Sequence, residues 1–257
     1  MSILNKFSLA GKVAIVTGSS TGLGQGIALG LAEAGADIVG VDYVDAPETK
    51  AQVEAFGRKY HGVKMDLIKN STPEALNALV ADAVKAFGKV DILVNNAGII
   101  RREDSLEFSE KNWDDVLAIN LKTVFFLSQA VANQYVAQKT GGKIINIASM
   151  LSYQGGIRVP SYTASKSGVK GITMTMANEW AKYNINVNAI APGYMATNNT
   201  EQLRADDKRS TEILERIPAD RWGTPADLAG AAVFLASDNA SYINGFTLAV
   251  DGGWLAR

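Results

Sequence analysis

Short apolar runs alternate along the chain with longer stretches of helical periodicity. The runs are rich in Val and Ile, mostly apolar on both faces, and lie at 13–17, 37–41, 62–65, 91–94, 143–148, 185–190 and 246–250. Helical patterns lie between them, at 23–34, 47–58, 73–87, 109–138, 160–183 and 225–236. Strands without a polar face are typical of a sheet that is covered by helices on both sides. The alternation therefore predicts an α/β fold built around a parallel sheet.

The domain organisation follows from the continuity of this pattern. No linker, internal repeat or low-complexity tract divides the 257 residues, so we expect one domain over 1–257. Residues 191–215 are the most irregular part, with Pro192 and Gly193 followed by a polar, charged run. A long segment of this kind beside a sheet edge predicts either a substrate lid or a plain surface excursion.

Bulk composition narrows the class of protein. A net charge of −1 and a pI of about 5.9 do not indicate a nucleic-acid partner. The chain has no cysteine and one histidine, His61, which excludes disulfides and thiolate metal sites and argues against any transition-metal site. The N-terminus does not resemble a signal peptide, and no uninterrupted apolar run approaches the ~18 residues of a membrane span. We therefore expect a soluble, cytoplasmic protein without a membrane partner.

A glycine-rich loop follows the first predicted strand. It reads TGSSTGLG at 17–24, with Gly18, Gly22 and Gly24 spaced G-x-x-x-G-x-G, and a helical pattern begins there. Glycines let the backbone approach a pyrophosphate closely, and a helix N-terminus supplies free N–H groups with a partial positive charge. Such a loop can also be a simple turn, but its place at the first strand–helix junction favours a dinucleotide site.

Asp42 ends the second predicted strand and is a candidate for cofactor selection. A carboxylate at this position can accept hydrogen bonds from both hydroxyls of an adenosine ribose, and it would repel a 2′-phosphate. The loop 17–24 has no Lys or Arg, and Tyr43 follows Asp42, so no obvious cation would neutralise that phosphate. These residues predict NAD(H) in preference to NADP(H), unless Asp42 is only a turn residue.

Tyr162 and Lys166 are candidates for acid–base chemistry. They are four residues apart, so on a helix their side chains share one face, and Ser149 precedes them at the end of a predicted strand. A tyrosine with a pKa of about 10 is a poor base at neutral pH. A nearby ammonium favours the phenolate and lowers that pKa. The spacing alone is not decisive, because Tyr60–Lys64 and Tyr135–Lys139 repeat it.

Taken together, these segments resemble the short-chain dehydrogenase/reductase family in its shorter form. The matching pieces occur in the family's order and cover nearly the whole chain: TGSSTGLG (17–24), Asp66, NNAG (95–98), Asn120, Ser149, YTASK (162–166) and PG (192–193). The resemblance implies a single-domain, Rossmann-like fold, doubly wound around a mainly parallel seven-stranded sheet with helices on both faces. It also implies an NAD(H)-dependent oxidoreductase that forms a homotetramer.

The resemblance also implies roles for individual residues. Ser149 would bond the substrate carbonyl, Tyr162 would transfer the proton, Lys166 would bind the nicotinamide ribose, and Asn120 would hold a water that links Lys166 to solvent. The implied cofactor-binding residues are Gly18, Ser20, Gly22, Leu23, Gly24, Asp42, Asp66, Asn95, Ala97, Gly98, Tyr162, Lys166, Pro192, Gly193 and Thr197. None of the four catalytic positions departs from the family pattern, so we expect hydride transfer coupled to proton transfer.

Several stretches, among them IIRREDSLEFSEKNWDD and VDGGWLAR, resemble family members that act on sugar acids. That resemblance implies reduction of 3-deoxy-D-glycero-2,5-hexodiulosonate to 2-dehydro-3-deoxy-D-gluconate in pectin degradation, or oxidation of 2-deoxy-D-gluconate at C3. A guanidinium fits a carboxylate with two parallel hydrogen bonds. We therefore expect Arg158, or one of Arg101 and Arg102, to bind the substrate carboxylate, with Ser149 and Tyr194 beside the rest of the substrate.

Two alternatives stay open at the level of the sequence. One is a reductase for another ketone, such as a 3-oxoacyl thioester or a polyol. The other is a non-catalytic NAD-binding regulator, against which the intact set of Asn120, Ser149, Tyr162 and Lys166 argues.

Overall fold

A seven-stranded parallel sheet forms the centre of the structure, a computed structural model that describes residues 2–257. The strands run in the order β3-β2-β1-β4-β5-β6-β7. Their bounds are β1 Val13–Thr17, β2 Asp37–Asp42, β3 Tyr60–Lys64, β4 Ile92–Asn95, β5 Gly142–Ile147, β6 Ile185–Pro192 and β7 Thr247–Val250. This order reverses direction at β1, so the fold is doubly wound, and the predicted Rossmann-like sheet is confirmed.

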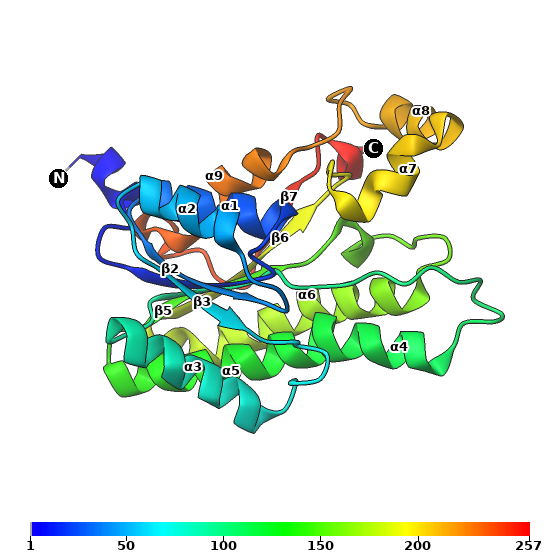
Figure 1. Ribbon diagram of the computed structural model, residues 1–257. Coiled ribbons are helices and arrows are strands. Elements are labelled where there is room, and N and C mark those ends of the chain that lie inside the picture. Colours follow the sequence, from blue (N-terminus) through cyan, green and yellow to red (C-terminus); the bar gives the residue numbers. More distant parts are fainter. Residues whose placement is uncertain (1) are drawn as a thin grey trace.

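Helices cover both faces of the sheet (Figure 1). On one face lie α1 (Gly22–Glu33), α2 (Pro47–Ala55) and α9 (Pro225–Ala236), and on the other lie α3 (Pro73–Phe87), α5 (Thr123–Gln138) and α6 (Pro160–Trp180). Each face has its own apolar core, one that includes Leu31 of α1 and Leu228 of α9, the other Leu79 of α3 and Leu127 of α5. The five inner strands are largely buried for this reason, which explains their apolar runs, whereas the edge strands β3 and β7 are partly exposed.

The stretch that the sequence predicts as one helix over 109–138 consists of three consecutive parts. These are α4 (Glu110–Leu117), a π-helical turn η2 (Ala118–Lys122) and α5. By length and composition this run could cross a membrane, but 56% of its most apolar window is buried inside the fold, as in a core helix. The π-helical turn, a feature often found at functional sites, places Asn120 inside the protein.

The irregular segment expected at 191–215 is largely helical. It contains α7 (Glu201–Ala205) and α8 (Asp207–Arg216), which lie beyond the carboxyl ends of the strands and close to the C-terminus (Figure 1). The apolar pattern could not show α8, because Ile213 is its only buried residue. Short 3-10 turns complete the chain at Ile3–Phe7, Met150–Ser152, Ala181–Tyr183, Asn198–Thr200, Asp238–Ala240 and Trp254–Ala256.

Candidate active site

Ser149, Tyr162 and Lys166 come from two elements that meet at the carboxyl edge of the sheet. Ser149 follows β5, and its hydroxyl accepts a hydrogen bond of 3.1 Å from the Leu151 N–H at the start of a 3-10 turn. Tyr162 lies in the first turn of α6, and Lys166 lies one turn further along the same helix. The Lys166 Nζ is 5.6 Å from the centroid of the Tyr162 ring, and it donates a hydrogen bond of 2.6 Å to the Ile147 carbonyl.

Burial controls the ionisation of this pair. It raises the pKa of Tyr162, while the Ser149 hydroxyl and the charge of Arg102 act in the opposite direction. Burial also lowers the pKa of Lys166 to about 8. The net direction at Tyr162 is therefore opposite to the one expected from the sequence, because desolvation by burial is the largest effect on its pKa. The phenol is held in its protonated form, which is the form that can donate a proton.

Asn120 ties the loop after β4 to the catalytic helix. Its side-chain amide donates to the Ile99 carbonyl (2.9 Å) and to Ser165 Oγ (3.2 Å), and its Oδ1 accepts from the Ile99 N–H (2.9 Å). A Cβ placed on Gly98 would lie 2.9 Å from Asn120 Oδ1 and 3.7 Å from Lys166 Nζ. Both amide hydrogens of Asn120 are therefore used within the protein, and the residue positions the wall beside Lys166.

The glycine loop forms a cradle for a pyrophosphate at the N-terminus of α1. Gly18 has a φ of +67°, and a Cβ placed on Gly24 would lie only 1.9 Å from the Gly18 carbonyl oxygen. Asn96 fixes the loop in this position close to α1, because its side-chain amide donates to the carbonyls of Thr17 (2.9 Å) and Gly18 (3.2 Å). The first-turn N–H groups of α1 are the donors that a phosphate group prefers. The residues present therefore fit a dinucleotide.

Asp42 lies beside this loop at the end of β2 and is nearly buried. Its Oδ2 accepts from the Ser20 N–H (3.0 Å), and its Oδ1 accepts from the Tyr43 N–H (2.8 Å). These bonds fix the carboxylate at the entrance of a cavity of about 340 Å³ that Asp66 and Arg101 also line. The lining is completed by Gly18, Val41, Asp42, Tyr43, Met65, Leu67, Ile68, Ala97, Ile99 and Ile119. This cavity is the natural place for the adenosine half of a dinucleotide.

Asn95 and Leu23 support the cofactor region from inside the protein. The Asn95 amide donates to Ser128 Oγ (3.0 Å) and to Asn146 Oδ1 (2.9 Å), so it belongs to a buried polar network below the loop. Leu23 packs against the apolar core under α1. Neither side chain lines the adenosine-side cavity, so their contribution is to hold the backbone above them.

Pro192, Gly193 and Thr197, which the resemblance assigns to the nicotinamide, lie at and after the end of β6. Pro192 ends β6, and Gly193 lines a second cavity, described next. A Cβ placed on Gly22 would come within 3.8 Å of Thr197 Cγ2, which places Thr197 over the start of α1. The structure therefore brings Thr197 next to the glycine loop and Gly193 to the cavity that Ser149 and Tyr162 line.

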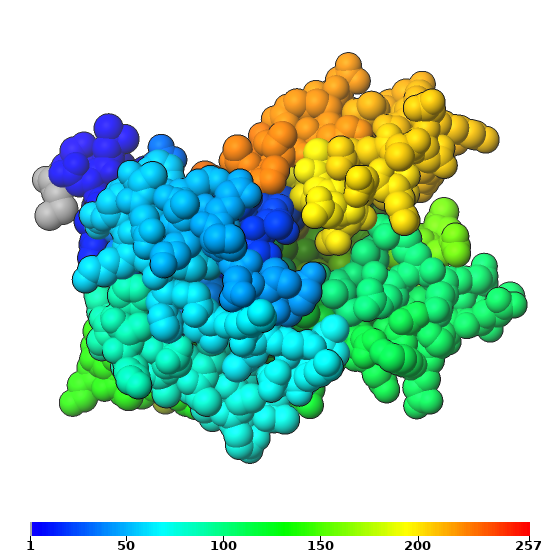
Figure 2. All heavy atoms as spheres, viewed as in Figure 1, coloured from blue at the N-terminus to red at the C-terminus, as the bar shows by residue number. Residues whose placement is uncertain are grey.

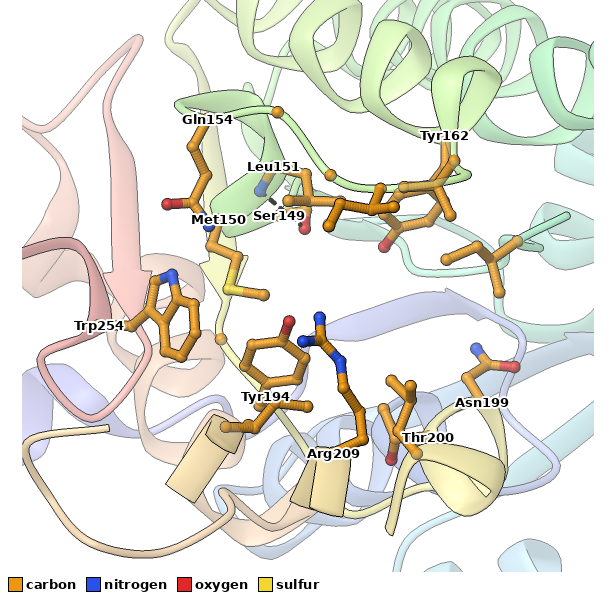
Figure 3. A pocket seen from close by; sticks show the side chains of 18 of the residues that line it. Ser149, Met150, Leu151, Gln154, Tyr162, Tyr194, Asn199, Thr200, Arg209 and Trp254 are labelled. Carbon is orange, nitrogen blue, oxygen red and sulfur yellow. Dashed lines mark hydrogen bonds between the residues drawn. The ribbon is translucent and has the colours of Figure 1, made fainter. Parts of the chain in front are cut away.

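The second cavity, of about 330 Å³, opens beside the catalytic residues. Figure 2 shows it as the hollow between the α7–α8 region and the segment around residue 100–115. Ser149 and Tyr162 line it, and Figure 3 shows their hydroxyls on its inner side. The other lining residues are Ile100, Arg102, Met150, Leu151, Gln154, Gly155, Gly156, Ile157, Val159, Gly193, Tyr194, Asn199, Thr200, Leu203, Arg209, Glu212, Ile213, Arg216 and Trp254.

Of the three arginines expected at the substrate, only Arg102 lines this cavity. Arg158 does not line it: the residue has a φ of +63°, its side chain is exposed, and its carbonyl accepts from the Glu103 N–H. Arg101 lines the adenosine-side cavity instead, while Arg102 lines the cavity beside Tyr162. Consecutive residues of an extended segment point to opposite sides, which separates this pair.

Tyr194 lines the cavity as predicted, and α8 contributes residues that the sequence analysis missed. Tyr194 packs edge-on against Trp222 (ring centroids 5.4 Å apart) and Trp254 (4.8 Å). Arg209, Glu212, Ile213 and Arg216 from α8 also face the cavity. Their spacing of three, four and seven residues is that of one helix face, a signal present in the sequence.

The chain matches known proteins over nearly its whole length. A family model described as Enoyl-(Acyl carrier protein) reductase matches residues 18–255. The 2-dehydro-3-deoxy-D-gluconate 5-dehydrogenase of Escherichia coli (strain K12) is 68% identical over 255 residues, which cover 99% of this chain and 100% of the relative.

Two crystal structures are similar throughout. A putative 2-deoxy-D-gluconate 3-dehydrogenase from Agrobacterium tumefaciens with bound NADP is 55% identical, with a TM-score of 0.92 over 98% of this chain and 100% of that one. A gluconate 5-dehydrogenase from Burkholderia cenocepacia J2315 in complex with NADP and tartrate is 38% identical, with a TM-score of 0.94 over 100% of both chains.

Proposed function

The chain belongs to the short-chain dehydrogenase/reductase family of oxidoreductases, and we propose that it reduces a ketone of a sugar acid with NADH. The proposed reaction converts 3-deoxy-D-glycero-2,5-hexodiulosonate to 2-dehydro-3-deoxy-D-gluconate, and the same site would oxidise 2-deoxy-D-gluconate at C3. The observation that carries this proposal is the cavity in which Ser149 and Tyr162 lie among three arginines. The name of the E. coli relative supports the same substrate class.

The chemistry assigned to the residues follows from their hydrogen bonds. Because the Leu151 N–H donates to Ser149 Oγ, the hydroxyl hydrogen of Ser149 is free to donate to a substrate carbonyl oxygen. Tyr162 donates to the same oxygen and transfers its proton as the alkoxide forms. A bound nicotinamide supplies the hydride. Lys166 would hold the hydroxyls of the nicotinamide ribose, and Asn120 keeps the adjacent wall in place.

Turnover measured on a panel of substrates tests this function. With NADH, kcat/KM for 3-deoxy-D-glycero-2,5-hexodiulosonate should exceed the values for a 3-oxoacyl thioester and for an uncharged polyol-derived ketone by at least ~10²-fold, because only the acid pairs with the arginines. With NAD⁺, 2-deoxy-D-gluconate should be oxidised. A preference for the thioester would identify a reductase for another ketone. Tight NADH binding without turnover of any compound would identify a regulator.

We also propose that the protein prefers NAD(H), although the A. tumefaciens and B. cenocepacia relatives were crystallised with NADP. Asp42 supports the proposal, because its carboxylate is fixed by two N–H groups beside the adenosine-side cavity. Two cations could favour NADP: Arg101, which lines the same cavity, and Lys64, which is next to Asp42 in the β2–β3 register. Its ammonium already pairs with Asp45, at 3.3 Å.

The cofactor preference should appear as a ratio of kcat/KM for NADH over NADPH of at least about 10, equivalent to about 1.4 kcal/mol. Repulsion between two unit charges 4 Å apart near a protein surface is about 4 kcal/mol, so Asp42 can supply this difference. Asp42→Ala should bring the ratio close to unity. Asp37→Ala removes an acid from the opposite end of the same strand and is the control, which should leave the ratio unchanged. A wild-type ratio below unity would contradict the proposal.

A further inference from the structure

The cavity beside Tyr162 is positively charged. Its ionised lining groups are three arginines, Arg102, Arg209 and Arg216, and one carboxylate, Glu212. The lining therefore carries an excess of two positive charges, whereas the whole chain has a net charge of −1. Charge concentrated in a concave site in this way raises the local concentration of an oppositely charged ligand. The cavity is thus built for an anion.

Two of the three arginines already have partners in the fold. Arg102 donates to the Asn199 carbonyl at 3.2 Å, so it joins the loop after β4 to the segment before α7. Arg216 lies with its guanidinium carbon 4.0 Å from the centroid of the Trp254 ring. Stacking on an indole face holds the guanidinium against the wall of the cavity. A substrate carboxylate that bound Arg102 or Arg216 would therefore disturb these contacts with Asn199 and Trp254.

Arg209 is in a different situation. It lies in the first turn of α8, where its N–H is capped by Asp206 at 3.0 Å, and its side chain reaches into the cavity (Figure 3). Its guanidinium pairs with Glu212, one turn further along the helix, at 3.1 Å. The two side chains are 42% and 48% exposed, and an ion pair this open to water contributes little stability. Another carboxylate can therefore displace Glu212 from Arg209 at a low cost in free energy.

The helix that carries Arg209 is fixed on its inner side only. Ile213 of α8 and the following Ile217 pack into a small apolar cluster with Met150 and Trp254. Met150 is the residue next to Ser149, so this cluster sets the position of α8 relative to the catalytic hydroxyls. Arg209 and Glu212 lie on the part of α8 that faces the cavity rather than in the cluster.

We propose that Arg209 is the specificity-determining residue that binds the substrate carboxylate, and that Glu212 occupies the guanidinium until the substrate arrives. The inference rests on the proposed sugar-acid function and deepens it. The hydrogen bond to Glu212 shows that this guanidinium can donate to a carboxylate in its present position. A sugar acid with its ketone at Ser149 and Tyr162 would present its own carboxylate to Arg209 and release Glu212 to solvent. The α7–α8 segment then acts as a lid that carries the recognition group.

The test compares a charged substrate with its uncharged counterpart. We expect Arg209→Ala to raise KM for 2-deoxy-D-gluconate by ~10–100-fold, the usual effect of losing a hydrogen bond to a charged group. KM for 2-deoxy-D-gluconamide, or its inhibition constant if it acts as a competitive inhibitor, should change by less than about twofold. Lys208→Ala removes the same charge from the neighbouring position of α8, which does not line the cavity, and should change neither value. Arg209→Gln repeats the test with most of the side-chain volume kept.

Glu212→Gln supplies the converse test. It removes the competing carboxylate, so KM for the sugar acid should fall by about two- to fivefold, with KM for the amide unchanged. If Arg209→Ala raises KM equally for the acid and the amide, or for neither, the assignment of Arg209 is overturned. The proposed function still holds in that case, provided that the wild-type enzyme turns over the sugar acid. Absence of wild-type turnover on the sugar acid would instead contradict the proposed function itself.

Discussion

Replacement of Tyr162 by phenylalanine is expected to lower kcat by about 10²–10⁴-fold, the usual contribution of a positioned proton donor. The ring would stay in place in the first turn of α6, so NADH affinity should stay within about threefold of the wild-type value. Burial keeps the phenol of the wild-type protein protonated, because it raises the pKa of Tyr162. Only the hydroxyl and its proton are lost in the variant. Steady-state kinetics of the wild-type and variant enzymes should be compared at pH 7, where Lys166 is charged because its pKa is about 8.

Tyr135→Phe is the matched control for this substitution. Tyr135 has the same spacing to a lysine, Lys139, but its hydroxyl donates to the Lys143 carbonyl at 3.2 Å in the core. Its removal should cost about 1 kcal/mol of stability and leave kcat unchanged. Near-normal turnover by Tyr162→Phe, or an equal loss of kcat in both variants, would contradict the role assigned to Tyr162.

The structure explains why one of three identical spacings forms a site. Tyr60 and Lys64 are at opposite ends of strand β3, so the extended backbone keeps the two side chains far apart. Lys139 is the residue after α5 and has a φ of +58°, so it leaves the helical face of Tyr135. Only Tyr162 and Lys166 share a helix. The periodic pattern placed Ser149 at a strand end and this pair on the following helix, and the family resemblance then assigned them to catalysis.

The apolar pattern of the sequence could not predict the residues on the substrate side of the cavity. Helix α8 buries only Ile213, so hydrophobic periodicity gives no sign of it, and its place opposite Tyr162 depends on packing against residues far away in the sequence. The choice among arginines depends on backbone detail as well. Arg158 is close to Tyr162 in sequence, but its left-handed backbone leaves its side chain exposed outside the cavity.

Ionisation of the catalytic pair shows a second limit of sequence reasoning. A Tyr–Lys pair on one helix face predicts a lowered tyrosine pKa, provided that the ammonium faces the phenol. In the structure the ammonium donates to the Ile147 carbonyl instead, and desolvation is the largest effect on the pKa of both groups. Spacing specifies which residues meet, whereas burial and competing acceptors decide their charge.

Gly24→Ala is expected to abolish most cofactor binding, with the NADH dissociation constant raised at least about tenfold. The new Cβ would lie 1.9 Å from the Gly18 carbonyl oxygen and 2.4 Å from Asn96 Nδ2, distances that real Cβ atoms do not show. The loop must therefore move away from α1 or lose the Asn96 hydrogen bonds to Thr17 and Gly18. Overpacking of a rigid site costs about 1–3 kcal/mol, so the melting temperature should fall as well.

Gly230→Ala separates this close contact from the general effect of adding a methyl group to a helix. Gly230 is exposed within α9, and a Cβ there would meet no atom within 4 Å in the described part of the chain. The same substitution should therefore stabilise the protein by about 0.5–1 kcal/mol, because alanine is the better helix former, and leave NADH binding unchanged. Fluorescence titration with NADH and thermal unfolding of both variants give the two readouts. Tight NADH binding by Gly24→Ala would show that the cofactor does not need the approach of α1 to Gly18, and the pyrophosphate cradle would have to lie elsewhere.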